Sequence, residues 1–271
     1  AQSIDLLQIS EQQMRDIRGR DIAMIFQEPM TALNPLFTIG NQIAEVLEQK
    51  QAVSGIDIAY TAIKLIASTG IADPERCAKS YPHQLSGGQR QRAMIAMALA
   101  CQPKLLLADE PTTALDVSLR LQILELLSGL QKQNGMAVLL ITHDLNLVRK
   151  FADRIIVMEG GHIVEQGTVS DVFANPQHAY TRKLLDSKPV RDVFESQTVG
   201  TQHPIIHAKD MSVSYPTPMA GIKGWIKKGE FAAVKHANFD LLPGQTLGVI
   251  GESGSGKTTL ALAALGLQAF T

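Results

Sequence analysis

The feature that most constrains the fold of this sequence is the order of two motifs that belong to α/β proteins. A glycine-rich loop at residues 251–258, GESGSGKT, stands near the C-terminal end, whereas an apolar segment that ends in two acids, Leu105 to Glu110, stands far earlier. The loop matches the pattern G-x-x-x-x-G-K-[S/T] of loops that bind phosphate groups. In a single NTPase domain the phosphate loop comes first. The sequence therefore predicts the back part of one nucleotide-binding domain, followed by the front part of another.

The glycine-rich loop lies where phosphate binding requires it, between an apolar segment and a helical pattern that begins at Lys257. Its glycines let backbone N–H groups close around phosphates, and the helix N-terminus adds a favourable dipole. We expect Lys257 to reach the β- and γ-phosphates and Thr258 to hold Mg²⁺. The predicted nucleotide-binding residues here are Gly251, Glu252, Ser253, Gly254, Ser255, Gly256, Lys257, Thr258 and Thr259. The alternative is a Gly/Ser-rich turn that merely starts a helix.

Acidic and basic side chains follow two short apolar segments that we expect to be strands. Asp109 and Glu110 follow the first, and His143 follows the second, at 136–141. Asp109 is suited to the Mg²⁺ shell, Glu110 to polarising an attacking water, and His143 to contacting a γ-phosphate. The alternatives are two acids that cap the next helix and a polar residue at a strand end. Gln27, after a third apolar segment, would by itself be read as a surface glutamine.

A second anion-binding pattern precedes the acidic strand end. Ser86, Gly87, Gly88 and Gln89 open a helical segment, which combines free N–H groups with a serine hydroxyl at a helix start. Taken alone, this pattern is also that of an ordinary helix cap. Its place shortly before Asp109 favours the functional reading.

The pattern of apolar residues predicts an α/β fold with a parallel core sheet that helices cover on both faces, because its strands are apolar throughout. Helical spacing predicts a helical subdomain at about 35–100, and the prolines between Glu28 and Pro35 predict a loop. A small antiparallel part is expected from a hairpin at 155–164. Further expected elements are helices at 10–18, 117–133, 169–174 and 178–185, a linker at 187–204, and strands at 22–26, 205–213, 231–239 and 246–250.

Composition excludes several classes of protein. The 25 basic residues are matched by 26 acidic ones, which argues against a nucleic-acid partner. Cys77 and Cys101 have no metal-ligand spacing and make no disulfide framework, so a reducing cytosol is expected. No apolar run approaches the ~18 residues of a membrane span. We also expect that both ends of the chain are cut from a longer protein.

Together these motifs resemble the ATPase of an ATP-binding cassette (ABC) transporter. Residues 85–89 match the family's signature motif, 105–110 its Walker B motif, 114–116 its D-loop and 251–258 its Walker A motif. The resemblance implies ATP and Mg²⁺ as cofactors and makes Gln27 the Q-loop residue and His143 the switch histidine. It assigns catalysis to Glu110, His143 and Gln27, ATP binding to the loop, to Ser86, Gly87, Gly88, Gln89, Asp116 and Tyr215, and Mg²⁺ to Thr258, Asp109 and Gln27. Tyr215 stands where the family places an aromatic on the adenine, although a core tyrosine is the alternative.

The resemblance covers the chain as two partial cassettes. Residues 1–186 match a P-loop NTPase cassette without its Walker A motif, and 205–271 match the start of a second. Two cassettes of this family pack head to tail around ATP, so Lys257 and Thr258 are expected to face the signature residues across one nucleotide. The other Walker A motif is expected before Ala1, and the second Walker B motif after Thr271. We therefore expect an ATPase as the parent protein and negligible turnover by the isolated chain.

The subfamily follows from residues 24–35 and from 175–185, NPQHAYTRKLL, which resemble the ATPases of oligopeptide/dipeptide importers. Ala179 departs from the usual His-Pro-Tyr. Tandem cassettes are similar to the microcin C-type and glutathione-type peptide importers. The resemblance implies permease subunits, a second cassette and, indirectly, a substrate-binding protein as partners, with a peripheral position on the cytoplasmic face of the inner membrane. The alternatives are a soluble ABC ATPase without a permease and an inactive fragment; the short irregular segment 187–204 and the lack of a coiled coil disfavour ribosome-acting and DNA-repair types.

Overall fold

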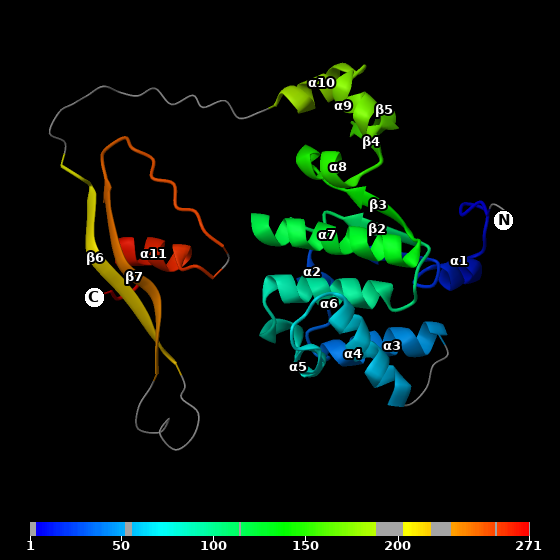
Figure 1. Cartoon of the computed structure of the whole chain (residues 1–271), viewed down its shortest axis with the longest axis horizontal. Coiled ribbons are helices and arrows are strands. Elements are labelled where there is room, and N and C mark those ends of the chain that lie inside the picture. Colours follow the sequence, from blue (N-terminus) through cyan, green and yellow to red (C-terminus); the bar gives the residue numbers. More distant parts are fainter. Residues whose placement is uncertain are drawn as a thin grey trace. The chain divides into compact units, whose positions relative to one another are not determined.

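The computed structural model describes residues 4–51, 56–113, 115–187, 203–217, 229–252 and 254–270. Contacts divide the chain into two compact units, Ala1–Val190 and Arg191–Thr271, which are described here separately (Figure 1). Most of the predicted linker lies outside the described residues, so the domain boundaries remain a prediction.

A three-stranded parallel sheet forms the centre of the first unit. Its strands β1 (Ile22–Ile25), β2 (Leu105–Asp109) and β3 (Ala137–Ile141) lie in the order β1-β2-β3. The first two are fastened at their start, because the Asp21 carbonyl accepts hydrogen bonds from the backbone N–H groups of Lys104 and Leu105. Ion pairs from Lys104 and Arg20 also hold the pKa of the Asp21 carboxyl below its usual range. Parallel pairing brings the carboxyl ends of all three strands to one edge.

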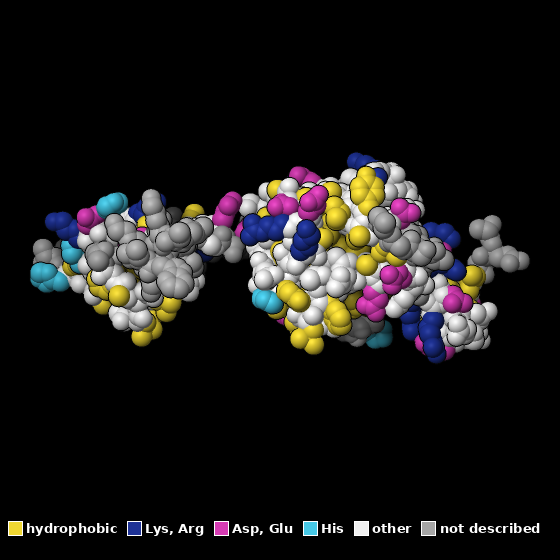
Figure 2. Space-filling view, turned by 90° about the horizontal axis from the view of Figure 1, so that it is seen from below, with side chains coloured by type: hydrophobic (Ala, Val, Ile, Leu, Met, Phe, Trp, Pro, Cys, Tyr) yellow, Lys and Arg dark blue, Asp and Glu magenta, His cyan; other side chains and the backbone are white. Residues whose placement is uncertain are grey.

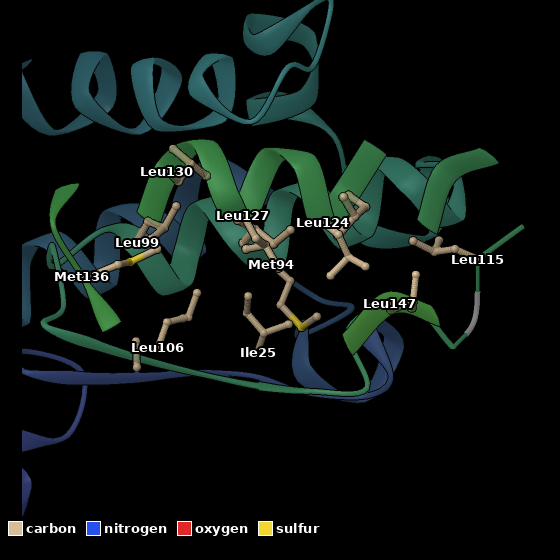
Figure 3. Close-up of a cluster of buried hydrophobic side chains, with 13 residues drawn as sticks. Ile25, Met94, Leu99, Leu106, Leu115, Leu124, Leu127, Leu130, Met136 and Leu147 are labelled. Carbon is tan, nitrogen blue, oxygen red and sulfur yellow. The ribbon is translucent and has the colours of Figure 1, made fainter. Parts of the chain in front are cut away.

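The core of this unit lies between one face of the sheet and the helices α6 (Gly87–Leu99) and α7 (Val117–Asn134). Ile25 and Leu106 from the strands are fully buried against Met94 and Leu127 from the helices (Figure 3). A shorter helix, α8 (Leu145–Phe151), adds Leu147 to the same cluster. Burial of these apolar side chains is what holds the sheet and helices together.

The opposite face of the sheet is more open. Met24, Leu139 and Ile141 point to that side, and 37%, 47% and 47% of their surfaces remain exposed. The predicted α/β class and the parallel sheet are confirmed. Within the described part of the chain, the buried cluster takes Ala23, Ile25 and Leu106 from one face of the sheet, whereas the other face is partly exposed.

A helical subdomain inserts between β1 and β2, as the helical spacing predicts. It comprises α3 (Ile39–Gln51), α4 (Ile56–Ser68), α5 (Pro74–Lys79) and the 3₁₀ turn η1 (Pro82–Gln84), around a second apolar cluster. Cys77 and Cys101 are both buried and form no disulfide, and burial raises the pKa of the Cys77 thiol to about 11.

Of two predictions for the N-terminal region, the helix is confirmed and the loop at 28–35 is not. The helix α1 (Glu11–Ile17) begins at a capping box between Ser10 and Gln13, as predicted. The prediction of a loop throughout 28–35 is wrong, because Pro29–Ala32 form a short helix, α2. Proline is compatible with the first helical turn, where its missing N–H has no intrahelical partner.

The predicted hairpin is confirmed as β4 (Arg154–Glu159) and β5 (His162–Thr168), joined by a glycine pair. The helices α9 (Val169–Ala174) and α10 (Ala179–Asp186) follow. The Glu165 carboxylate on β5 accepts the backbone N–H groups of Gln177 at 2.8 Å and His178 at 3.0 Å. This carboxylate therefore fastens the turn that leads into α10.

The second unit is a twisted hairpin with one helix against it. The antiparallel strands β6 (Ile206–Thr217) and β7 (Gly229–Leu241) pair along their length, and α11 (Lys257–Ala264) packs on them through Ala263. The predicted strand at 246–250 is wrong: these residues form no ladder, and 95% of the Ile250 surface is exposed. An apolar run becomes a strand only through pairing, and no described segment pairs with it.

Among the helices that the structure describes, none has the length and apolar character needed to cross a membrane.

Candidate functional site

The candidate catalytic site lies at the carboxyl ends of the three parallel strands. Gln27, Glu110 and His143 follow β1, β2 and β3 respectively, and the structure brings their side chains together. Nε2 of Gln27 donates a 2.9 Å hydrogen bond to Oε2 of Glu110. Nδ1 of His143 lies 3.1 Å from Oε1 of the same carboxylate. In open α/β sheets, ligands bind at this edge, outside the carboxyl ends of the strands.

The backbone of Glu110 is held in an unusual conformation. Its φ is +42°, in the left-handed region that a residue with a Cβ seldom adopts. Its N–H group donates a 2.9 Å hydrogen bond to the carbonyl of Ile141 at the end of β3. A non-glycine residue held in this region stores strain, and such residues cluster at functional sites. The bond to β3 thus fixes the carboxylate relative to the strand that carries His143.

Glu110 is ionised in this environment. Hydrogen bonds from Thr113, His143 and Gln27 hold the pKa of its carboxyl below the usual range. An ionised carboxylate only accepts hydrogen bonds, so Nδ1 of His143 carries a proton. When the imidazole is neutral, its other nitrogen, Nε2, is then an acceptor. The His143 side chain is 66% exposed, which leaves Nε2 accessible from solvent.

Thr113 is a site residue that the sequence reasoning missed. Its hydroxyl donates a 2.7 Å hydrogen bond to Oε2 of Glu110, and its N–H donates to the Glu110 carbonyl at 3.2 Å. The sequence does contain a signal for this contact, since Pro111 occupies the second position of a four-residue turn that begins at Glu110. Such a turn returns its fourth residue to the first.

Asp109 and Gln27 supply oxygen atoms that suit Mg²⁺. The Asp109 side chain is half-buried at the end of β2, beside Glu110. The Gln27 amide uses its nitrogen on Glu110, so its carbonyl oxygen remains the free end of the amide for a cation. The described residues contain no group of three or more His, Cys, Asp or Glu side chains that could hold a metal. Proteins bind Mg²⁺ through one or two carboxylates together with phosphates and water.

The predicted anion-binding segment forms the start of α6. Ser86 is its N-cap: Oγ accepts from the N–H of Gln89 at 3.3 Å, and Oε1 of Gln89 accepts from the N–H of Ser86 at 3.0 Å. Gly88 is buried, and a Cβ there would lie 3.2 Å from Leu119 on α7. The geometry is a complete capping box, as expected for an ordinary helix cap. The same helix N-terminus also has exposed polar groups, so the geometry is compatible with anion binding as well.

Asp116 lies next to this segment, at the start of α7. Its Oδ1 atom accepts the N–H of Leu119 at 3.0 Å and the hydroxyl of Ser118 at 2.9 Å. Leu115, just before it, lies within contact distance of a Cβ placed on Gly87. Asp116 therefore acts as a helix cap, in a loop that packs on the start of α6. Ala114, also in the predicted D-loop, lies outside the described residues.

The glycine-rich loop of the second unit curls around its own lysine. Nζ of Lys257 donates hydrogen bonds to the carbonyls of Gly251 at 2.8 Å and Glu252 at 2.6 Å, and to Oγ of Ser255 at 3.3 Å. Gly256 has a φ of +92° and lies against the backbone of Ala233 on β7. The lysine is thus directed toward the middle of the loop, where a phosphate would carry the opposite charge.

The remaining predicted ATP-binding residues of this unit lie around the loop. Thr258 and Thr259 stand in the first turn of α11, directly after Lys257, and Gly254 has a positive φ of +81° within the loop. Ser253 lies outside the described residues. Tyr215 pairs with Phe231 across the hairpin and packs, half-buried, against the apolar cluster of the unit. Its role on an adenine remains a prediction.

Comparison with known proteins places these motifs in a family. A model described as "ABC transporter" matches residues 2–113 and 234–270, and one described as "Oligopeptide/dipeptide transporter, C-terminal region" matches 164–210. Two solved structures are similar: the ATP-binding cassette MJ0796 bound to ADP and Pi (TM-score 0.54, 35% identity, 60% of this chain and 68% of that one), and cbiO1 from Clostridium perfringens (TM-score 0.52, 29% identity, 60% and 62%).

Two curated relatives align with nearly the whole chain. It is 53% identical over 259 residues to the "Peptidoglycan transport ATP-binding protein YejF" of Agrobacterium fabrum, covering 96% of this chain and 47% of the relative. It is 43% identical over 292 aligned positions to the "Glutathione import ATP-binding protein GsiA" of Escherichia coli K12, covering 98% of this chain and 46% of the relative. The chain therefore spans about half the length of the curated relatives it matches.

Proposed function

The chain belongs to the ABC transporter family, and from this premise we propose that it is part of an ATPase that energises a peptide importer. The observation that carries the proposal is the carboxylate of Glu110, held by Gln27 and His143 at the edge of the parallel sheet. This constellation is suited to activating a water molecule for attack on a phosphoryl group.

In the proposed reaction Glu110 is the general base. It accepts a proton from water while the water oxygen bonds the γ-phosphorus, and the bridging oxygen leaves with ADP. The Nε2 atom of His143 is the group suited to contact the γ-phosphate, because Nδ1 is occupied by Glu110. A hydrogen bond to a phosphate oxygen requires the imidazolium form, in which Nε2 is a donor as well as Nδ1. Asp109 and Gln27 would hold the Mg²⁺ of this site, whereas Thr258 would hold the Mg²⁺ of the phosphate loop in the second unit. The ion neutralises the charge of the phosphates when bound. Orientation and charge, rather than covalent chemistry, are the protein's contribution.

We further propose that Glu110 and the Lys257 loop belong to two different cassettes. The Walker A pattern follows the Walker B pattern along the chain, whereas one cassette has the reverse order. Relatives of about twice the length support this arrangement, since each has room for two cassettes. The first unit would supply Gln27, Glu110 and His143 to one ATP site, and the second would supply its phosphate loop to another.

Peptides are the proposed cargo. The supporting observations are the match of residues 164–210 to the oligopeptide/dipeptide transporter region and the names of relatives that import glutathione or transport peptidoglycan. The complete transporter would also contain permease subunits, a second cassette and a substrate-binding protein. The ATPase would bind peripherally to the membrane. On the face of the first unit that Figure 2 shows, basic side chains are interspersed with acidic ones, which suits contact with proteins more than with nucleic acid.

The test of this function is ATP hydrolysis by the protein that carries this chain, purified with and without its permease. The proposal expects Mg²⁺-dependent hydrolysis that the permease and a peptide-loaded binding protein stimulate, and that Glu110→Gln abolishes. Hydrolysis without any association with a permease would instead favour the soluble ABC ATPase. A protein that binds ATP but never hydrolyses it would favour the inactive form.

A further inference from the structure

The Glu110 carboxylate has a third partner besides Gln27 and His143. A turn brings Thr113 back toward Glu110, so that the hydroxyl of Thr113 donates to Oε2 at 2.7 Å while its N–H donates to the Glu110 carbonyl at 3.2 Å. The short distance is typical of a hydroxyl that donates to a charged oxygen. Of the three contacts on this carboxylate, it is the shortest.

The three contacts divide unequally between the two carboxylate oxygens. Oε2 accepts from both Thr113 and Gln27, whereas Oε1 lies against Nδ1 of His143. Each carboxylate oxygen has about two acceptor positions. Within the described part of the chain, Oε2 is therefore saturated, and Oε1 retains one acceptor position.

We propose that Thr113 is a positioning residue that fixes the Glu110 carboxylate so that Oε1 is the oxygen that receives the proton of the attacking water. The inference rests on the proposed function, because it presumes that Glu110 is the general base. It extends that function to a residue outside the Gln27, Glu110 and His143 set. In this role Thr113 acts through its hydrogen bond to Glu110.

The geometry explains why Gln27 alone does not suffice. Gln27 lies at the end of β1 and reaches Glu110 through a long side chain, and we propose that its carbonyl oxygen also serves Mg²⁺. Thr113 reaches the carboxylate from the same short turn, which Pro111 restricts and the N–H of Thr113 closes. Its hydroxyl therefore keeps Oε2 occupied whatever Gln27 does.

The experiment compares Thr113→Val with Thr113→Ser in the complete ATPase with its permease. Valine has nearly the shape of threonine but no hydroxyl, whereas serine keeps the hydroxyl. We expect Thr113→Val to lower kcat by about tenfold to a hundredfold, the scale of one hydrogen bond to a charged group, while KM for ATP changes by less than about twofold. Thr113→Ser should recover kcat to within about threefold of the wild type. The same exchange at Thr61 on α4, Thr61→Val, is the matched control.

The outcomes separate this inference from the function on which it rests. If Glu110→Gln stops hydrolysis but Thr113→Val leaves kcat unchanged, the role of Thr113 is refuted and the proposed function stands. If Glu110→Gln leaves hydrolysis intact, Glu110 is not the base and both fall. A parallel loss of kcat and thermal stability in Thr113→Val, which serine does not correct, would show a merely structural role and also overturn the inference.

Discussion

Nδ1 of His143 lies 3.1 Å from Oε1 of Glu110, although the two residues follow different strands and are far apart in the sequence. Two features of the backbone produce this proximity. Parallel pairing of β2 with β3 places both strand ends at one edge, and the N–H of Glu110 binds the carbonyl of Ile141, which lies two residues before the histidine. The contact leaves Nε2 as the end of the imidazole that can meet a phosphate.

His143→Ala should therefore reduce ATP turnover without unfolding the protein. The side chain is 66% exposed, so its removal costs little packing. We expect kcat to fall by about a hundredfold, the usual range for a group that stabilises charge in a transition state, with a melting temperature within about 2 °C of the wild type. Steady-state hydrolysis and calorimetry check both parts. An unchanged kcat would remove His143 from the catalytic set.

Lys257→Ala should weaken nucleotide binding by the second unit. Its ammonium group supplies the positive charge at the middle of the loop, and its loss should raise the Kd for ATP by at least about tenfold. Titration calorimetry with the purified chain measures the change. The matched control is Lys209→Ala, because Lys209 is exposed on β6, where the strand pairs with residues near Phe239 rather than near Ala233. Equal affinities of the two variants would contradict the assignment of the loop.

Gly256→Ala should destabilise the second unit more than Gly244→Ala. Both glycines have positive φ values, +92° and +73°, so alanine at either position costs about 1–2 kcal/mol of backbone strain. At Gly256 the new Cβ would also collide with the carbonyl of Ala233, whereas nothing lies within 4 Å at Gly244. Overpacking adds about 1–3 kcal/mol at the first site. Denaturant unfolding measures the difference, and two equal losses would show that the contact is relaxed in solution.

Acid should loosen the turn into α10 through Glu165. Hydrogen bonds from the backbone N–H of Gln177 and of His178 hold the pKa of the Glu165 carboxyl below its usual range. A lowered folded-state pKa gives stability that is present above the unfolded pKa and is lost as the pH falls through the folded value. Glu165→Gln should lower stability at pH 7 and flatten this acid-side decrease. Glu159→Gln, on the same hairpin, is the matched control, and identical profiles for both variants would contradict the role of Glu165.

Much of the fold could be predicted from the sequence, because local patterns and burial agree in most elements. The apolar run at Leu105–Asp109 and the helical spacing of α3 and α4 are signals of this kind. The prediction of a strand at 246–250 is wrong, because a strand needs a pairing partner as well as a suitable sequence. No described segment of the second unit pairs with these residues. Pro29 was taken for a loop residue although proline also suits a first helical turn.

The candidate site was predicted by residue type but not by geometry. Strand ends in a parallel sheet pointed to Glu110 and His143, whereas Gln27 was assigned through the family resemblance, and the catalytic roles of all three stay predictions. The positive φ of Glu110 determines which carboxylate oxygen contacts which partner. Such a φ could not be predicted from the sequence, because Glu110 is not a glycine. Thr113 was missed because a threonine in a turn is common, and its hydroxyl becomes informative only beside a carboxylate.

The most direct test of the account is ATP hydrolysis by the 271-residue chain alone, with Glu110→Gln and Lys257→Ala as paired variants. If the catalytic carboxylate and the phosphate loop belong to different cassettes, the chain binds ATP through the Lys257 loop, shows no turnover above background, and keeps its affinity in Glu110→Gln. Mg²⁺-dependent turnover that each of the two substitutions abolishes would contradict this, because it would place Glu110 and Lys257 in one working site.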